Sequence, residues 1–168
     1  MVWKKVFILA VFLCVSLWTA KRLLSYVVFV NDESTEPFKW FLKTEKHAEV
    51  GDYVLVKGKE SDSHTRGKLL TKKILCAYPY SLKKKGLSYY CCSEKTCRFL
   101  HKALKKTPRG TVLVPFNPCK GNSYTSECVV KIPEGYYYVG TSSPIGYDSR
   151  YLGYFEKKEI KAVLIPLF

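Results

Sequence analysis

The C-terminal stretch IPEGYYYVGTSSPIGYDSRYLGYFEKKEI, residues 132–160, places Asp148 and Arg150 on either side of Ser149. Glycines, tyrosines and strand-forming residues surround this triplet, and an exposed loop rarely needs so many aromatic side chains. A buried strand tolerates Asp and Arg together only when their charges are paired. Standing two residues apart, they point to the same side of an extended segment. The pattern predicts two charges, paired with each other or with neighbours, that organise a site.

Two other segments carry residue types that can perform chemistry. Ser34 begins the sequence STEP at positions 34–37, and Lys72 and Lys73 lie in the strand-like sequence KLLTKKILCAY. A serine hydroxyl is a poor nucleophile until a base takes its proton, and lysine can be that base when apolar burial lowers its pKa. These residues predict a serine nucleophile with a lysine base. Taken alone, however, Ser34 is more typical of a turn and the lysines of a strand edge.

The elements that must position these residues are mainly short strands. Strand-like patterns occur at 27–30, in GDYVLVKGK, KLLTKKILCAYPY and GTVLVPF, on both sides of the turn Pro133–Gly135, and in IKAVLIPLF at the C-terminus. FLHKALKK, residues 99–106, has apolar residues at helical spacing and predicts one helix. We therefore expect a mainly β domain over residues 25–168, with a cysteine-rich and lysine-rich insertion at about 81–128.

Six of the seven cysteines lie beyond the first segment of the chain. An even number in an exported domain predicts disulfides, although six cysteines allow fifteen pairings and the sequence does not choose among them. The adjacent Cys91 and Cys92 are expected to reach different partners, because a bond between them would strain the backbone. A zinc site of Cys91 or Cys92 with Cys97 and His101 is the alternative, but its spacing is irregular and no metal is expected.

The first 24 residues contain an uncharged apolar stretch, Val6 to Ala20, with lysines before it and Lys21 and Arg22 after it. The stretch is short for a membrane span, but basic side chains can extend it from both ends. We expect a retained membrane anchor over residues 1–24, with a cleaved signal segment as the alternative. The net charge of +14 favours acidic partners such as anionic lipid. Without a nucleic-acid module signature, no nucleic-acid partner is expected.

The order of these segments resembles the type I signal peptidase family. In that family a serine box follows the anchor, then come a Gly-Asp strand, a Lys-Arg strand, a Pro-Glu-Gly-x-Tyr strand and an Asp-Ser-Arg-Tyr box. Here PEGYYYVG and YDSRYLGYF match most closely, and the insertion has no counterpart. The resemblance implies a signal-peptidase-like β-fold with one N-terminal transmembrane helix. It also implies a serine endopeptidase without a cofactor, with Ser34 and Lys72 as the dyad and Asp148 and Arg150 holding the site strands together.

The sequence departs from the family pattern at several positions. Thr35 stands where the family usually has Met, and a register closer to the peptidases of plasmid transfer (the TraF type) would make Thr35 the nucleophile. Counting back from Pro79 selects Lys73 as the base in place of Lys72. The serine that often supports the lysine is replaced by Gly146, for which Ser142 or Ser143 could compensate.

The small size and the insertion are more similar to a dedicated processing enzyme than to a housekeeping one. The resemblance therefore implies a single-pass protein of the bacterial inner membrane, with its catalytic domain in the periplasm and a pilin-like precursor of the conjugative apparatus as substrate. Hydrolysis and ring closure share an acyl-enzyme and stay open as alternatives. The rival interpretation is an inactive, disulfide-stapled assembly factor of the transfer or secretion apparatus with the same fold.

Overall fold

The computed structural model describes residues 2–30, 37–119 and 127–167. Within them, helix α1 (Val2–Leu24) precedes eleven strands. The strands are β1 (Val27–Phe29), β2 (Trp40–Thr44), β3 (Tyr53–Lys57), β4 (Leu69–Ala77), β5 (Ser81–Lys85), β6 (Ser88–Cys92), β7 (Cys97–Lys102), β8 (Cys128–Lys131), β9 (Tyr136–Gly140), β10 (Phe155–Glu156) and β11 (Ile160–Pro166). Two short helices, α2 (Ser149–Leu152) and η1 (Lys157–Glu159), lie near the C-terminus. This content confirms the mainly β class.

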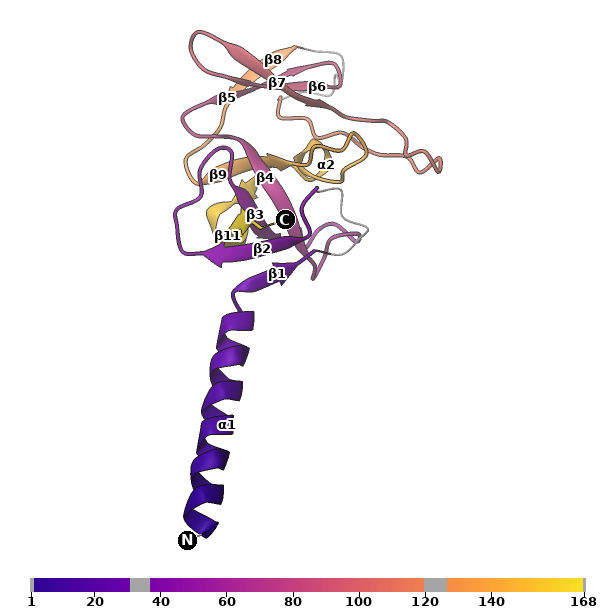
Figure 1. Cartoon of the computed structure of the whole chain (residues 1–168). Coiled ribbons are helices and arrows are strands. Elements are labelled where there is room, and N and C mark those ends of the chain that lie inside the picture. Colours follow the sequence, from indigo (N-terminus) through magenta and orange to yellow (C-terminus); the bar gives the residue numbers. More distant parts are fainter. Residues whose placement is uncertain (1, 31–36, 120–126, 168) are drawn as a thin grey trace.

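Helix α1 extends away from the strands (Figure 1). Among the described residues, no helix is both long enough and apolar enough to cross a membrane, so the transmembrane helix expected from the sequence is not found. The physical reason lies in the charges at both ends of the helix. They leave Val6–Ala20 as the uncharged part, which is shorter than the roughly 20 apolar residues that a span needs.

Seven strands form one antiparallel sheet in the order β1-β2-β11-β3-β4-β9-β10. Its interior is apolar and includes Val54 and Val56 of β3, Ile74 of β4 and Val139 of β9, all fully buried. β3 is the central strand of this sheet, with β11 on one side and β4 on the other. β4 carries the two candidate lysines, and β3 and β9 flank it.

Four further strands form a second antiparallel sheet in the order β7-β6-β5-β8, at the end of the molecule opposite α1 (Figure 1). This sheet spans residues 81–131 and so contains the segment that the sequence sets apart as an insertion. Its inner side packs on the first sheet through a shared cluster in which Leu82 and Tyr89 meet Cys76 of β4 and Tyr138 of β9. The insertion is thus a layer on the larger sheet rather than a loose appendage.

Three disulfides join Cys76 to Cys91, Cys92 to Cys97 and Cys119 to Cys128. They confirm the expectation that disulfides hold the insertion together and that the adjacent cysteines have different partners. Each cysteine of the zinc alternative is used in a disulfide, and His101 is hydrogen-bonded to the Tyr138 hydroxyl at 2.9 Å. These residues therefore do not supply a thiolate and imidazole set for zinc.

Two expectations for the insertion were wrong. The segment with helical spacing forms strand β7, which pairs with β6 and is tied to it by Cys92–Cys97. A bulge at Leu100 breaks the strand alternation, and this is why the apolar residues mimic helical spacing. The expected strand after Gly110 is also not formed, since an isolated bridge between Lys106 and Val112 is the pairing observed there. Cross-strand pairing has overridden the local pattern in both places.

Candidate active site

Lys72 lies in the middle of strand β4, directly opposite Val54 of β3. Its side chain is buried, with a relative exposure of 8%. The fully buried Ile74 lies two residues further along the same strand. A lysine in this position has its alkyl chain in the core of the sheet, which is the surrounding that the sequence predicted for a lysine base.

Lys73 occupies a different environment, although it is the next residue. It pairs with Tyr53 on β3 and with Gly140 on β9, and its side chain is only half-buried. Its ammonium lies 5.5 Å from the centroid of the Tyr53 ring, in a cation–π contact. The structure therefore separates the two lysines that the sequence leaves as alternatives.

A β-bulge follows the two lysines. In the pairing of β4 with β9, Ile74 lies opposite Val139 and Cys76 lies opposite Tyr138, so Leu75 is an extra residue. A bulge inserts one residue between positions that would otherwise be consecutive in register. Counting back from Pro79 to the lysines crosses this extra residue, so the count that selects Lys73 in the sequence depends on the register of β4 with β9.

Lys72 lines a cleft of about 1080 Å³. Strands β1 and β4 form much of its wall, and residues from the 62–68 turn and the 143–147 loop complete it. Its lining is Val27, Val28, Phe29, Val30, Lys43, Leu55, His64, Thr65, Lys68, Leu69, Leu70, Thr71, Lys72, Ile145 and Tyr147. The cleft therefore has a mixed apolar and polar lining and is bordered by one buried amine, that of Lys72.

Ser34 and Thr35 lie outside the described residues. The described chain before them ends at Val30, which lines the cleft, and resumes at Pro37. The backbone N–H of Val30 donates a hydrogen bond to the carbonyl oxygen of Lys39 at 2.9 Å. The choice between the two candidate nucleophiles stays a prediction from the sequence.

Asp148 and Arg150 are both completely buried and form a two-point ion pair. Arg150 Nε donates to Asp148 Oδ1 at 2.9 Å, and Nη2 donates to Oδ2 at 2.7 Å. The pairing follows the expectation, but the segment is not extended, because Asp148 is the N-cap of α2 and accepts the Arg150 backbone N–H at 3.0 Å. Burial lowers the pKa of Arg150, but hydrogen bonding and charge attraction to the Asp148 carboxylate, with smaller contributions from Tyr151 and Tyr138, together raise the pKa overall.

The pair holds the 141–146 loop against the end of β9. Asp148 Oδ2 accepts the backbone N–H of Thr141 at 3.0 Å. Arg150 donates to the carbonyl oxygens of Ser143, Pro144 and Gly146 at 2.8–2.9 Å. Because the same loop carries Ile145 and Tyr147 to the cleft, this pair fixes the wall that faces Lys72.

Gly146 sits where the family pattern would put its lysine-supporting serine, and the space there is occupied. A Cβ at this position would collide with Thr141 Oγ1 and lie 2.7 Å from Arg150 Nη2. Ser142 is exposed, and Ser143 Oγ accepts from the backbone N–H of Ile145 at 3.4 Å. The contacts named for these two serines do not include Lys72.

The sequence analysis missed Tyr147 as a residue of the site. Its hydroxyl donates to Asp62 Oδ1 at 2.9 Å, its ring meets the His64 ring edge-on at 5.8 Å, and burial first, then Asp62, raises its pKa to about 12. These contacts join the 62–68 turn to the 143–147 loop at one side of the cleft. Its position next to Asp148 was the available signal, but the Asp62 contact joins residues 85 apart and has no local sequence mark.

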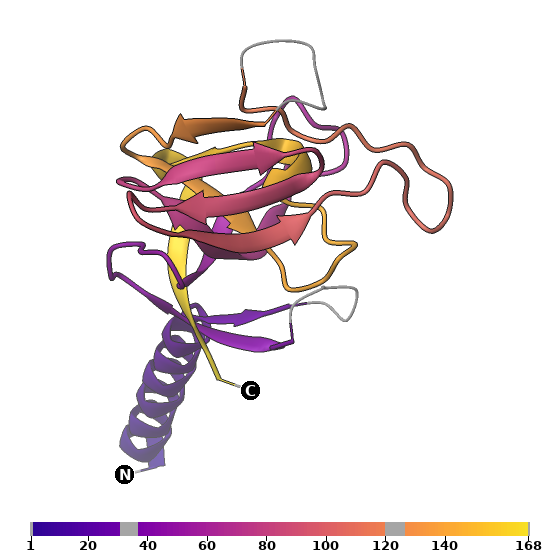
Figure 2. The same ribbon diagram turned by 90° about the horizontal axis from the view of Figure 1, so that it is seen from above.

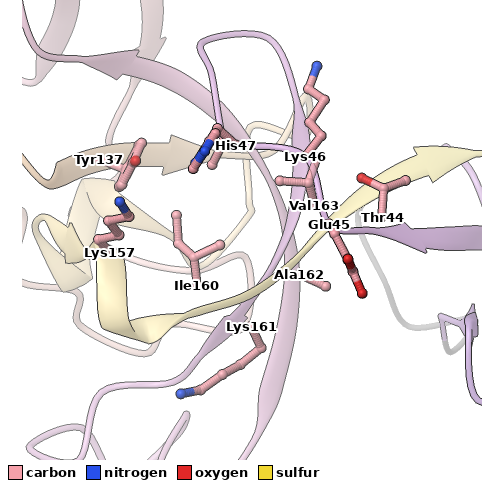
Figure 3. A pocket seen from close by; sticks show the side chains of 11 residues that line it. Thr44, Glu45, Lys46, His47, Tyr137, Lys157, Ile160, Lys161, Ala162 and Val163 are labelled. Atoms are coloured by element: carbon pink, nitrogen blue, oxygen red, sulfur yellow. The ribbon is translucent and has the colours of Figure 1, made fainter.

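A second, smaller hollow of about 240 Å³ lies between the end of β2, the 45–48 turn and β11 (Figure 3). Lys46 and Lys161 extend away from it. Lys46 donates to Asp52 at 2.8 Å, and Lys161 donates to the carbonyl oxygen of Lys158 at 2.9 Å. Lys46 and Lys161 are therefore engaged locally, and we take the larger cleft beside the buried Lys72 as the better candidate for chemistry.

Comparison with known proteins does not assign the chain to a family. No family model and no curated protein matches the chain. Four solved chains match, and one of them is a signal peptidase I from Enterococcus faecalis V583. It is 18% identical, the match covers 73% of this chain and 100% of that one, and the TM-score is 0.41. A likeness at this level does not establish a shared activity, so membership of the signal peptidase family stays a prediction from the sequence motifs.

Proposed function

We propose that this protein is a serine endopeptidase of the signal-peptidase type that processes exported protein precursors. One observation carries the proposal: the buried Lys72 borders a cleft of about 1080 Å³ whose wall includes Val30 and other apolar residues. Ser34 follows Val30 by four residues, and four extended residues span at most about 14 Å. A hydroxyl on this segment is therefore within reach of the cleft that holds the amine.

The proposed chemistry divides one difficult step into two. Ser34 Oγ attacks the scissile carbonyl carbon while Lys72 Nζ accepts the hydroxyl proton. Lys72 then returns this proton to the leaving amine, the C–N bond breaks, and an acyl-enzyme remains. Water, or the free amine of the substrate itself, releases the acyl group, which gives either a cleaved or a cyclised product. The cleft suits an extended substrate segment with apolar side chains, as exported precursors carry around their cleavage sites.

Oxidising surroundings suit this function. The three disulfides support a compartment where disulfides persist, such as the bacterial periplasm. A pilin-like precursor of a conjugative apparatus is the proposed substrate, in line with the small size and the cysteine-rich insertion, which are more similar to a dedicated processing enzyme than to a housekeeping one.

The test is incubation of the full chain with candidate pilin precursors, read by intact mass. We expect processing by the wild type, none by Ser34→Ala, and near-normal processing by Thr35→Val. Hydrolysis gives two fragments that together weigh one water more than the precursor, whereas cyclisation gives a joined product that lacks this water. Activity in Ser34→Ala with loss in Thr35→Val would transfer the nucleophile to Thr35.

A second candidate is a catalytically inactive assembly factor with the same fold. It is favoured by Gly146, because a serine at this position would collide with Thr141. An inactive factor predicts that the wild type leaves every precursor intact while still binding it. The same incubation therefore distinguishes the two functions.

A further inference from the structure

The positive charge of the protein is concentrated in the four-stranded sheet and its loops. Residues 81–131 contain eleven Lys and Arg and two Asp and Glu, a net charge of +9. The rest of the β domain, residues 25–80 and 132–168, contains thirteen basic and twelve acidic residues, a net charge of +1. The proposed peptidase chemistry uses no residue of this segment, so the excess charge needs its own explanation.

Strand pairing arranges part of this charge on one face. Lys83 of β5 lies between Val129 of β8 and Tyr90 of β6, and Tyr90 lies opposite Phe99 of β7. These four residues form a row across all four strands. No described helix or strand covers the face that carries the row, which Figure 2 shows from its outer side. Phe99 is 55% exposed and packs edge-on against Tyr90, with ring centroids 5.5 Å apart.

Lysines flank the row on both sides along the strands. Lys85 and Lys102 both pair with Ser88 in the neighbouring row on one side, and Lys131 pairs with Ser81 on the other. Lys84, by contrast, points inward, is completely buried, and donates to Asn117 Oδ1 at 3.2 Å. The alternation of the strand thus divides the Lys83–Lys85 run into an inward residue and two outward residues.

Within the described residues, the outward lysines make exposed or partly exposed contacts: Lys131 lies 5.5 Å from the centroid of the Tyr78 ring, and two others pair with Glu127. Lys83 and Lys85 share the carboxylate of Glu127, at 2.5 and 3.7 Å. Exposed pairs of this kind contribute little free energy and are readily exchanged for another carboxylate. A partner that brings several carboxylates therefore displaces Glu127 at little cost.

We infer that this face, made of Lys83, Lys85, Tyr90, Phe99, Lys102 and Lys131, is a docking surface for an acidic polypeptide segment. Carboxylates of the segment pair with the lysines on both sides of the row, and an apolar side chain of the segment packs on the exposed edge of Phe99. The spacing of about 7 Å between alternate rows of a strand matches alternate residues of an extended peptide. The surface acts independently of the proposed peptidase site.

Other anionic partners fit the face less well. Nucleic-acid bases stack on open aromatic faces, whereas Tyr90 and Phe99 meet at 70° and cover one another. Phe99 and Val129 lie at opposite ends of the row with a lysine between them, so the face lacks the continuous apolar area that inserts into a bilayer. Charge and shape together favour a polypeptide.

The test measures binding of the full, oxidised chain to a short fluorescent peptide of alternating glutamate and leucine, by anisotropy. The same peptide with glutamine in place of glutamate is the comparison ligand. We expect the glutamate peptide to bind more tightly, and the double variant Lys83→Glu with Lys131→Glu to bind it about tenfold more weakly, because two ion pairs become two repulsions. Phe99→Ala is expected to weaken binding about threefold without changing its salt dependence.

The matched control is Lys57→Glu with Lys158→Glu, which makes the same change in net charge on exposed, ion-paired lysines outside the four-stranded sheet. We expect it to bind the glutamate peptide nearly as the wild type does. Equal weakening by both double variants, or equal binding of the two peptides, would overturn the proposal. Preferential binding of anionic lipid vesicles or single-stranded DNA through Lys83 and Lys131 would replace the polypeptide by that class of partner.

Discussion

The two sheets of this protein are stabilised in different ways. The seven-stranded sheet has an apolar interior built from Val54, Val56, Ile74 and Val139, and the acidic and basic residues around it nearly cancel. The four-stranded sheet is smaller, and all three disulfides have at least one cysteine in its strands. A small sheet buries too little apolar surface to be stable alone. The disulfides and the core shared with the larger sheet supply the remaining stability.

This difference shows how an insertion can be added to a sheet without disturbing its core. Two of the contacts between the sheets lie at the β-bulge of β4: Cys76 is bonded to Cys91, and Arg98 donates to the carbonyl oxygen of Leu75 at 2.9 Å. The four-stranded sheet therefore holds the strand that carries Lys72 just beyond the lysine. The predictions below test whether the two sheets act as separate or coupled units.

The largest expected effect is on activity. Lys72→Met should lower precursor processing by about 10²–10⁴-fold, the usual contribution of a general base, while a cooperative thermal melt shows that the variant still folds. Intact mass spectrometry of the products and a thermal melt measure the two quantities.

Lys73→Met is the matched control for Lys72→Met and should retain most of the activity. It removes a half-buried amine and its contact with the Tyr53 ring, and not the amine that borders the cleft. The opposite result, with Lys73 essential and Lys72 dispensable, would move the base to the other side of the strand.

The buried ion pair should have the largest effect on stability. Asp148→Asn and Arg150→Met should each lower the free energy of unfolding by about 3–5 kcal/mol, because each leaves a buried charge without its partner. The double variant should lose less than the sum of the two, as residues in direct contact do. Urea unfolding of the four proteins provides the cycle, and strictly additive losses would contradict a direct pair.

The coupling of the sheets is tested by the Cys76–Cys91 disulfide. Replacing both cysteines by alanine should lower the free energy of unfolding by about 3 kcal/mol, because this bond closes a loop of 15 residues. If the sheets are coupled, unfolding of the variant remains a single transition and precursor processing falls. Two separate transitions with full processing would mean that the four-stranded sheet is an independent unit. Replacing Cys92 and Cys97, whose bond lies wholly within the four-stranded sheet, is the control.

A smaller, pH-dependent effect is expected from His101, whose burial lowers its pKa to about 4. In the unfolded chain its pKa returns to about 6.5, so the unfolded state binds the proton more tightly. The free energy of unfolding is therefore unaffected by this group above about pH 6.5. It falls by at most about 3 kcal/mol as the pH drops toward 4. His101→Phe should flatten the stability profile between pH 4 and 6.5 relative to the wild type. An unchanged slope in the variant would assign the dependence to other groups.

Much of the larger sheet could be predicted from the sequence. The patterns at 27–30 and 69–77, the turn at Pro133–Gly135 and the C-terminal apolar run all mark strands that the structure contains. The pairing of Asp148 with Arg150 could also be predicted, because two opposite charges two residues apart in an aromatic, buried segment are stable only when they are paired. These features depend on neighbours within a few residues, and such neighbours are visible in the sequence.

The rest depended on contacts between distant residues. Apolar spacing at 99–104 favoured a helix, but pairing with β6 and a disulfide made it a strand. The fifteen possible cysteine pairings became one set only when the strands were placed side by side. The contact of Tyr147 with Asp62, the crowding at Gly146 and the extra residue at Leu75 likewise depend on packing or register.

The sequence by itself therefore determined the mainly β class and the presence of disulfides, and it supplied the residue types of the proposed serine–lysine site. The tertiary structure decided which of the two neighbouring lysines borders the cleft and which face of the insertion is exposed. The physical reason is the same in both cases. Side chains alternate between two faces along a strand, so a shift of one residue exchanges a buried position for an exposed one. Only pairing with the neighbouring strands fixes that register.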